Sequence, residues 1–421
     1  MTSYLNTIKQ FNTNLRFFFA ATAVHSFIFF GIYTLLLNLY LLRLGYGSAF
    51  IGLVNGIAPL VLALASLPAN FITTHIGCRK AIIVGYLFIA VGFLLLPLSS
   101  YVPESIREAW IVGSYALAWF SGSLMVVNTH PYIMGAAGEA EREHAFAIQS
   151  AIYPLFGFLG NLVGGFLPTF FANVFAVDLE SAVPYRAALL LASVLYLFSA
   201  YAMKQTKEVA YEVSAITSHK PQSRIPLTFI FIIALVHLLI TGTEWTLRIY
   251  TNVYLDTVLA VPTALIGGIS AAGQLLGLVA LLSPLIMARW GQRRTIIYGM
   301  LALGLIFLPI ITIAHWTAVG FSFIGMIAMI SLIGPAFAVY SQSNVAAEWR
   351  TSIASATTLA FGIGIALTAL GGGQLVAVQG FQPLFLLAAV APLLGAGLFG
   401  GYTYRKVAVA IPPLQPLPKS Q

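Results

Sequence analysis

Apolar stretches long enough to cross a bilayer follow one another along almost the whole chain. A membrane-spanning helix needs about 20 mostly apolar residues, because the hydrocarbon core of a bilayer is about 30 Å thick. Twelve stretches meet this condition, and short polar connections separate most of them. They cover residues 15–42, 49–73, 81–100, 109–137, 145–173, 184–203, 226–255, 262–287, 295–314, 316–342, 351–379 and 383–403. The sequence therefore predicts an all-α polytopic membrane protein with twelve transmembrane helices.

Composition excludes a water-soluble protein. Charged residues make up 8% of the 421 residues, whereas a soluble domain carries roughly 25% because its surface must face water. The first apolar stretch continues to about Leu42, which is too long for a signal peptide, so we expect it to remain as the first helix. The single cysteine, Cys78, excludes an intramolecular disulfide and a cysteine-based zinc site. We expect no cofactor and no metal.

Positive charge is distributed unevenly between the loops on the two sides of the membrane. With the N-terminus in the cytoplasm, sixteen of the 20 Lys and Arg residues fall in cytoplasmic segments, and three, Arg43, Arg107 and Arg186, fall in outer segments. Because loops rich in Lys and Arg stay on the cytoplasmic side, we predict a plasma-membrane protein with both termini in the cytoplasm. The net charge of +8 then reflects topology, and we expect no nucleic-acid partner.

The longest polar segment between apolar stretches divides the chain into two halves. Residues 1–203 form a predicted N-terminal six-helix bundle, and residues 226–406 form a C-terminal one. Residues 204–225 between them are predicted to be a cytoplasmic linker. The tail, residues 407–421, holds four prolines and is expected to be disordered.

The two halves repeat each other in sequence. The matches are residues 38–41 with 252–255, residues 51–52 with 266–267, and residues 77–85 with 291–299. The first and third matches have an offset of 214 positions, and the second has an offset of 215. An ordered series at a nearly constant offset indicates a duplication. Two parallel halves, related by an axis along the membrane normal, are one arrangement that transporters build from such repeats.

Two loops carry a family resemblance. Residues 70–80 and 284–294 resemble the signature of the major facilitator superfamily, which lies between helices 2 and 3 and between helices 8 and 9. In that family the loop begins with Gly, carries an Asp and ends with Gly-Arg-Arg/Lys, and its charges hold a cytoplasmic gate. The matching residues are Gly77, Arg79 and Lys80 in the first loop and Gly291, Arg293 and Arg294 in the second.

The same loops depart from the signature. Asn70 and Pro284 replace the first Gly, and Thr74 and Ala288 occupy the Asp positions. These loops therefore lack the Asp of the family's latch between Asp and Arg. The basic residues are interpreted either as gate residues or as topology anchors. The resemblance still implies the major facilitator fold, with helices 1, 4, 7 and 10 around a central cavity, and secondary transport as the activity.

A glycine-rich stretch of the predicted fifth helix resembles part of an antiporter signature. The matching residues are Gly157, Gly160, Asn161, Gly164 and Gly165, with Asn161 where a Pro is usual. Small residues also occur wherever helices pack closely in lipid, and packing is the interpretation that we favour. The Arg that many proton-driven exporters carry in helix 4 is absent, because residues 119–122 read Trp-Phe-Ser-Gly.

The predicted seventh helix carries the densest charge inside the membrane. His237, Thr241, Glu244 and Arg248 are spaced by four, three and four residues, which places them on one helical face. Ionisable groups inside a bilayer are costly unless they face a cavity or a partner. We predict that Glu244 is a proton or substrate-cation site and that Arg248 either sets its protonation or binds an anion. A purely structural ion pair is the alternative.

Further residues are candidates for the same site. His25 in the first helix is a second candidate for reversible protonation, since histidine titrates near neutral pH. The residues predicted to line the cavity are Tyr33, Asn38, Trp119, Asn128, His130, Trp245, Tyr340 and Gln342.

The sequence predicts a transporter rather than an enzyme. It contains no nucleotide-binding signature of the Gly-x4-Gly-Lys-Ser/Thr type, so we expect no use of ATP and a monomer driven by an ion gradient. Our first interpretation is secondary active transport of a small organic molecule by alternating access, coupled to protons, with export of a lipophilic compound as one direction. Uptake of a nutrient or an organic anion is the alternative within the same fold. A non-transporting scaffold and a membrane-embedded enzyme are alternatives of a different class.

Overall fold

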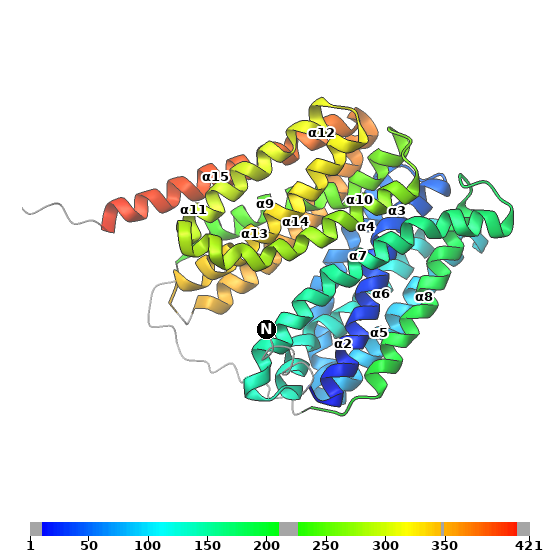
Figure 1. Cartoon of the computed structure of the whole chain (residues 1–421), viewed down its shortest axis with the longest axis horizontal. Helices are drawn as coiled ribbons and strands as arrows, with labels where there is room; N and C mark the ends of the chain where they lie inside the picture. The colour runs from blue at the N-terminus through cyan, green and yellow to red at the C-terminus, as the bar shows by residue number, and fades with distance from the viewer. Residues whose placement is uncertain (1–10, 210–225, 347–348, 411–421) are drawn as a thin grey trace, which may run out of the picture.

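The computed structural model describes residues 11–209, 226–346 and 349–410 of the chain. In this part of the chain the regular secondary structure is helical throughout, without strands. The helices form two bundles that follow each other in sequence and lie side by side (Figure 1). Those of the first half are α2 Thr13–Ser26, η1 Phe27–Tyr33, α3 Thr34–Arg43, α4 Ser48–Ile76, α5 Cys78–Leu95, α6 Glu104–Ala136, α7 Arg142–Phe175 and α8 Ala182–Lys204. Those of the second are α9 Leu227–Thr257, α10 Thr263–Leu276, η4 Gly277–Leu282, α11 Ser283–Ile306, α12 Leu308–Thr312, α13 Trp316–Ser343, α14 Arg350–Gln379 and α15 Phe381–Ala410.

The predicted number of membrane crossings is confirmed. Within the described residues, eleven segments are long and apolar enough to cross a membrane, and one of them, Thr263–Thr312, has 50 residues. At about 1.5 Å per residue this segment would be more than twice the thickness of a hydrocarbon core of about 30 Å. Gly291 divides it, because its backbone is not helical (φ 76°, ψ 160°). The described residues therefore contain twelve crossings, with this segment counted as two.

Two boundaries of the predicted domains can be set beside the ends of helices. α8 ends at Lys204, one residue into the predicted linker, and most of that linker, residues 210–225, lies outside the described residues. α15 continues to Ala410, into the segment that was expected to be a disordered tail, and residues 411–421 lie outside the described part. His315 begins α13 as its N-cap and accepts a hydrogen bond from the backbone of Thr317, which separates the ninth and tenth crossings as predicted.

The duplication is visible in the backbone as well as in the sequence. Gly77 and Gly291, which match at the offset of 214, adopt nearly the same conformation, with φ and ψ of 87° and 159° in the first and 76° and 160° in the second. This region of backbone space is essentially restricted to glycine. In both halves the glycine turns the chain sharply from one crossing into the next.

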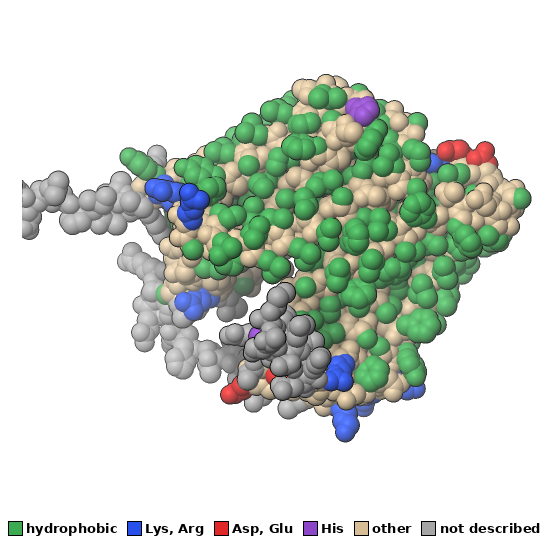
Figure 2. All heavy atoms as spheres, viewed as in Figure 1, with side chains coloured by type: hydrophobic (Ala, Val, Ile, Leu, Met, Phe, Trp, Pro, Cys, Tyr) green, Lys and Arg blue, Asp and Glu red, His purple; other side chains and the backbone are tan. Residues whose placement is uncertain are grey.

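Apolar side chains cover the flanks of the molecule, and basic side chains gather at one end. Figure 2 shows hydrophobic side chains spread over both halves, with Lys and Arg at the left and lower ends of the two bundles. We call this the basic end; the crossings that meet there carry Arg79 and Lys80 at the start of α5, Arg142 at the start of α7, and Arg293 and Arg294 in α11. An apolar flank of this extent suits a lipid environment.

The two halves contact each other through glycines away from the basic end. α4 packs against α14, where a Cβ on Gly373 would approach the Cα of Gly52 to 3.1 Å. α7 packs against α10, where a Cβ on Gly165 would lie 3.1 Å from the Cα of Gly267. Small residues allow helix backbones to approach this closely in lipid. Toward the basic end the halves diverge (Figure 1).

The glycines of the two loops give a first prediction. Gly291→Ala should lower stability by about 1–3 kcal/mol, the usual cost of a residue held in a disfavoured backbone region. Gly77→Ala should cost at least as much, because its Cβ would also lie 2.9 Å from the carboxylate of Glu208, which would have to shift, whereas nothing lies within 4 Å at Gly291. Thermal unfolding of the purified protein in detergent measures both changes.

Gly113→Ala in α6 is the matched control, since this glycine is helical and has open space around it. It should leave stability unchanged or raise it by up to about 1 kcal/mol. Equal effects of all three substitutions would contradict the assignment of strain to the two loops.

Candidate functional site

A cavity of about 190 Å³ lies between the two halves. The first, fourth, seventh and tenth crossings all contribute to it, as the family resemblance implies, together with α4, α7, α10 and α14. Its aromatic lining includes Phe29, Phe30, Tyr115, Trp119, Trp245 and Phe361. Its uncharged polar lining includes Asn38, Asn55, Asn161, Asn252, Ser270 and Gln274.

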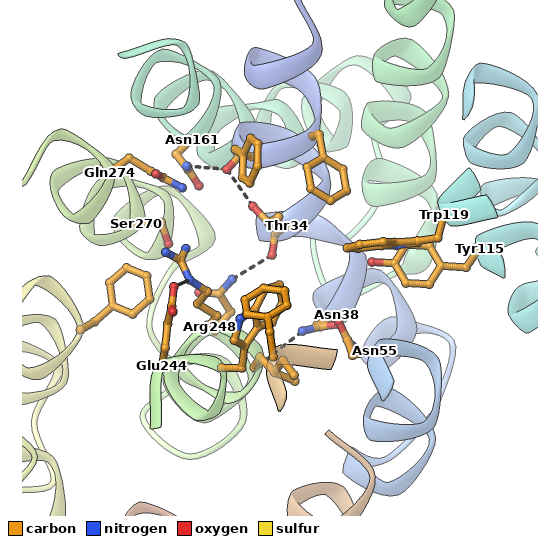
Figure 3. A pocket seen from close by; sticks show the side chains of 17 residues that line it. Thr34, Asn38, Asn55, Tyr115, Trp119, Asn161, Glu244, Arg248, Ser270 and Gln274 are labelled. Atoms are coloured by element: carbon orange, nitrogen blue, oxygen red, sulfur yellow. Dashed lines mark hydrogen bonds and ion pairs between the residues drawn. The ribbon is translucent and has the colours of Figure 1, made fainter. Parts of the chain in front are cut away.

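Two charged residues of α9 face this cavity and bind each other. The Nε of Arg248 donates a hydrogen bond of 2.7 Å to Oε1 of Glu244, one turn earlier on the same helix. The side chains keep 27% and 15% of their exposure, so both remain accessible from the cavity. Figure 3 shows Arg248 lying between Glu244 and Ser270, with Tyr115 and Trp119 on the far side of the cavity. Within the described residues, the two Nη atoms of Arg248 have no hydrogen-bond partner.

The amide groups of the lining bind mainly the protein itself. Asn38 donates to the carbonyl of Ile249 at 2.9 Å and accepts from Asn55 at 2.9 Å. Asn161 donates to the carbonyls of Phe30 at 3.0 Å and Gly157 at 2.9 Å. The NH₂ groups of Asn55 and Asn161 already donate to other protein atoms. Their amide oxygens therefore remain as hydrogen-bond acceptors for a molecule in the cavity.

The first crossing is not a regular α-helix, and the cavity lies at the irregular part. η1, residues Phe27–Tyr33, is a π-helix. The carbonyl of Phe30 there accepts hydrogen bonds from Asn161 and from the hydroxyl of Thr34, the latter at 2.8 Å. π-helical turns inside α-helices are rare and occur frequently at functional sites. In this chain the irregular turn carries two lining residues, Phe29 and Phe30.

Two indole groups in the lining lack hydrogen-bond partners. In the described part of the chain, the buried Nε1 atoms of Trp119 and Trp245 have none. A buried donor without a partner costs about 1–3 kcal/mol. Trp119 packs against Phe29 and Tyr115, with ring centroids 5.6 Å and 6.1 Å apart, and Trp245 packs against Phe361 at 6.3 Å.

The cavity is closed on the side away from the basic end by contacts between α3 and α9. Asn38 binds the carbonyl of Ile249, and Asn252 approaches the carbonyl of Leu35 at 3.5 Å. These two contacts are equivalent under the offset of 214, so each half donates to the other.

An ion pair lies beyond these amides. Arg43 binds Asp256 through two hydrogen bonds of 2.7 Å, and the two side chains are 11% and 7% exposed. The guanidinium also lies 3.3 Å from Glu180, which is 76% exposed, and over the ring of Tyr185. We call Arg43 and Asp256 the α3–α9 clasp.

Of the residues predicted to form the site, the structure brings five together at the cavity: Glu244, Arg248, Trp245, Asn38 and Trp119. The other two residues predicted on the same face of α9, His237 and Thr241, do not line the cavity. His237 stacks on Phe337 at 5.4 Å, and Thr241 is buried where α9 approaches Gly364 of α14.

Two predicted residues lie inside the first half, behind the lining. His25 is buried, with Nδ1 2.8 Å from the hydroxyl of Tyr196, and its ring stacks on Phe29 at 5.6 Å. Tyr33 is buried and donates to the carbonyl of Phe93 at 2.6 Å.

Four further predicted residues lie apart from the cavity. Asn128 is buried and donates to Thr73 at 2.7 Å, and His130 is exposed beside Phe146. Tyr340 packs on Phe399 at 4.9 Å. The carbonyl of Gln342 accepts a hydrogen bond from Arg350 at 3.2 Å. The direction in which a helix presents a polar residue depends on tertiary packing, which the sequence did not reveal.

Several lining residues were not predicted, and the repeat could have found some of them. Asn252 matches Asn38 at an offset of 214, and Ser270 matches Asn55 at 215. Asn161 was noted only as a departure from a glycine-rich pattern. Gln274, which matches Pro59 at the same offset of 215, has no polar counterpart to mark it.

The sequence pattern of the Major Facilitator Superfamily matches residues 18–369. The chain belongs to the Major Facilitator Superfamily. It is therefore a multi-pass membrane protein of a transporter family. Comparison with curated proteins finds no match.

Solved structures with the same fold cover the chain almost completely. A bacterial homologue of the human lysosomal transporter Spinster, in an inward-facing and unoccupied conformation, has a TM-score of 0.73 and 14% identity, over 95% of this chain and 98% of that one. The nucleoside transporter NupG has a TM-score of 0.69 and 13% identity, over 93% and 99%. A bacterial homologue of the iron transporter ferroportin, in an inward-facing state, has a TM-score of 0.69 and 13% identity, over 93% and 98%. At these identities the similarity establishes the fold alone.

The first signature loop of this superfamily member contains a carboxylate that comes from outside the loop. Thr74 occupies the Asp position, but Glu208, just beyond α8, accepts a hydrogen bond of 2.9 Å from the backbone N–H of Arg79. Arg79 in turn donates through Nη2 to the carbonyl of Lys204 at 2.7 Å. A carboxylate at the start of α5 is favourable, because the first N–H groups of a helix have no partner within it. The start of the linker thus holds the loop, which the sequence did not predict.

The second loop is more open. Arg293 and Arg294 border a hollow of about 340 Å³ at the basic end, together with Ile297 and Tyr298. Lys80, the last predicted residue of the first loop, is exposed. Glycine packing also explains the stretch of α7 that resembles an antiporter signature, since Gly165 meets Gly267.

The α3–α9 clasp gives a second prediction. Asp256→Asn should weaken closure beyond the cavity by about 2 kcal/mol, or roughly 30-fold in population, because it leaves the buried Arg43 without its main partner. Spin labels at Glu104 and Val258, exposed on opposite halves at that end, would then report longer distances by pulsed electron resonance.

Glu180→Gln is the matched control. Exposed ion pairs contribute about 0–1 kcal/mol, so removing this charge should leave the distance distribution nearly unchanged. The single native cysteine, Cys78, is buried, and both experiments use a Cys78→Ala background. Equal responses of the two variants would contradict a specific role of Asp256.

Proposed function

We propose that this protein is a secondary active transporter that couples movement of a small organic molecule to movement of protons by alternating access. In the proposed cycle, the halves rock about the cavity, which is open first toward the basic end and then toward the opposite end. The glycine contacts and the α3–α9 clasp support this proposal, since they join the halves mainly on one side of the cavity. No step uses ATP, a metal or a cofactor, and a monomer suffices.

The observation that carries the proposal is the ion pair of Glu244 and Arg248. Among the described residues that line the cavity, these two carry the formal charges. Charged groups at this depth are expensive and mark substrate paths and proton relays in transporters. Glu244 is therefore the proposed proton site, and Arg248 the group that senses its charge. The pair lies in a chamber accessible from one side, as a coupling site must.

Orientation follows from the basic loops. We place the basic end and both termini in the cytoplasm and the protein in the plasma membrane, because loops rich in Lys and Arg remain on that side. The conformation described then faces inward.

Two directions of coupling fit the pair. Competition between a proton and a cationic or lipophilic substrate at Glu244 gives exchange, and therefore export against a proton gradient; the aromatic lining supports this interpretation. Cooperation between a proton on Glu244 and an anion on Arg248 gives symport, and therefore uptake. The free Nη atoms of Arg248 favour symport.

A third prediction tests the proton site without knowledge of the substrate. Spin labels at Ser150 and Asn344, exposed on opposite halves near the basic end, report how far the halves open there. In the Cys78→Ala background, lowering the pH from about 7.5 to about 5.5 raises the protonated fraction of any carboxyl group and should shift the distance distribution. Glu244→Gln mimics the protonated carboxyl and should hold the low-pH distribution at both pH values.

Glu180→Gln, which removes an exposed carboxylate outside the cavity, should respond to pH like the parent protein. In reconstituted vesicles, Glu244→Gln should also abolish accumulation driven by a pH gradient while the unfolding temperature stays unchanged. A pH response of Glu244→Gln equal to that of the parent would remove Glu244 from the mechanism.

A further inference from the structure

Arg248 presents a free face to the cavity. Its Nε is occupied by Glu244, but its two Nη atoms have no partner among the described residues, and the side chain is 27% exposed. A guanidinium forms its strongest hydrogen bonds with a carboxylate or a phosphate, through two parallel N–H groups. Trp245 lies three residues earlier on the same helix, and its buried indole N–H is also without a partner. Arg248 and Trp245 therefore both leave hydrogen-bond donors unused on neighbouring positions of α9.

The remainder of the cavity suits one aromatic ring. Phe29, Phe30, Tyr115 and Trp119 line the cavity from the first half, and we call them the aromatic wall. Figure 3 shows Tyr115 and Trp119 across the cavity from the charged pair. An engineered apolar cavity of about 150 Å³ is large enough to bind benzene. The volume here, about 190 Å³, has room for one ring and a short chain.

The charge of Glu244 restricts the ligand further. A cation at Glu244 would be repelled by Arg248, whose Nε already binds that carboxylate at 2.7 Å. A zwitterion would need both groups free, whereas they occupy each other. An anion on Arg248 would be repelled by ionised Glu244, and this repulsion disappears when Glu244 takes up a proton. Anion and proton therefore favour each other's binding, and by thermodynamic linkage they do so by the same factor.

We propose that the cavity binds an aromatic organic monocarboxylate, with its carboxylate on the Nη atoms of Arg248 and its ring against the aromatic wall, together with one proton on Glu244. This inference rests on the proposed function, since it assigns the substrate of the same cavity. It also selects symport over exchange as the direction of coupling, because the two ligands bind cooperatively. The carboxylate replaces the interaction that Arg248 loses when Glu244 becomes neutral.

A set of ligands with one ring and different charges tests the substrate class. Isothermal titration of the purified protein in nanodiscs uses benzoate, phenylacetate and phenylpropionate as anions, phenylalanine as the zwitterion, phenylpropylamine as the cation and phenylpropanol as the neutral analogue. At least one of the three anions should bind more tightly than the other three compounds. Its affinity should be higher at about pH 5.5 than at about pH 7.5, although its carboxyl group is mostly ionised at both, like a Glu side chain in water.

Variants assign the contacts. Arg248→Gln should weaken binding of the anion by roughly 10- to 100-fold, the usual effect of losing hydrogen bonds to a charged group, and leave binding of phenylpropanol unchanged. Arg248→Lys keeps the charge but loses the paired donors. Its affinity for the anion should therefore lie between those of the parent protein and of Arg248→Gln. Glu244→Gln should bind the anion equally well at both pH values. Unchanged binding of phenylpropanol shows that each variant is folded.

The outcomes separate this inference from the proposed function. Failure of all three anions to bind, tighter binding of phenylalanine or phenylpropylamine, or an affinity independent of Arg248 or of pH would overturn the substrate class. Accumulation of any other compound driven by a pH gradient would then leave the proposed function standing. Binding of the anion as described, without accumulation in vesicles under a pH gradient, would support the substrate class and overturn coupled transport.

Discussion

The joint between α3 and α9 determines where the cavity can open. Two equivalent asparagines, Asn38 and Asn252, reach across it to main-chain carbonyls of the opposite half, and the paired charges of Arg43 and Asp256 lie beyond them. Polar groups that meet in a dry helix crossing have no water to bind instead, so the halves gain by staying together there. Because the helices are stiff, closure at this joint holds the halves apart toward the basic end, and the cavity lies between.

The charged pair occurs in one repeat only, whereas the structural features around it occur in both. The loop glycines, the amides at the joint and the glycines between the halves have counterparts in both repeats. The charged pair does not, since Glu244 and Arg248 correspond to Phe30 and Thr34, which lie opposite in the same cavity. One repeat thus contributes the charges, and the other contributes the aromatic wall and the irregular helix.

The fold could be predicted from the sequence because every helix that crosses lipid needs about 20 mostly apolar residues. Apolar length marked each helix, and repeated glycines such as Gly77 and Gly291 marked the turns. The charged pair could be predicted for the same reason, since charge is rare in such helices. Uncharged polar residues follow no comparable rule. Asn55 faces the cavity while Asn128 binds Thr73 inside the first half, and nothing in either local sequence separates the two cases. The π-helical turn depends on contacts with α7, which are also set by the assembled bundle.

The placement of Glu244 and Arg248 on one helix has a consequence for the empty transporter. An ion pair between the two halves would break each time the halves rocked. A single charge without a partner would have to move through the low-dielectric interior. Partners one turn apart on α9 belong to the same half, so rocking of the halves does not by itself separate them. The two opposite charges therefore cancel within the empty site. In the proposed cycle, reorientation of the empty protein then moves no net charge of this pair through the membrane field.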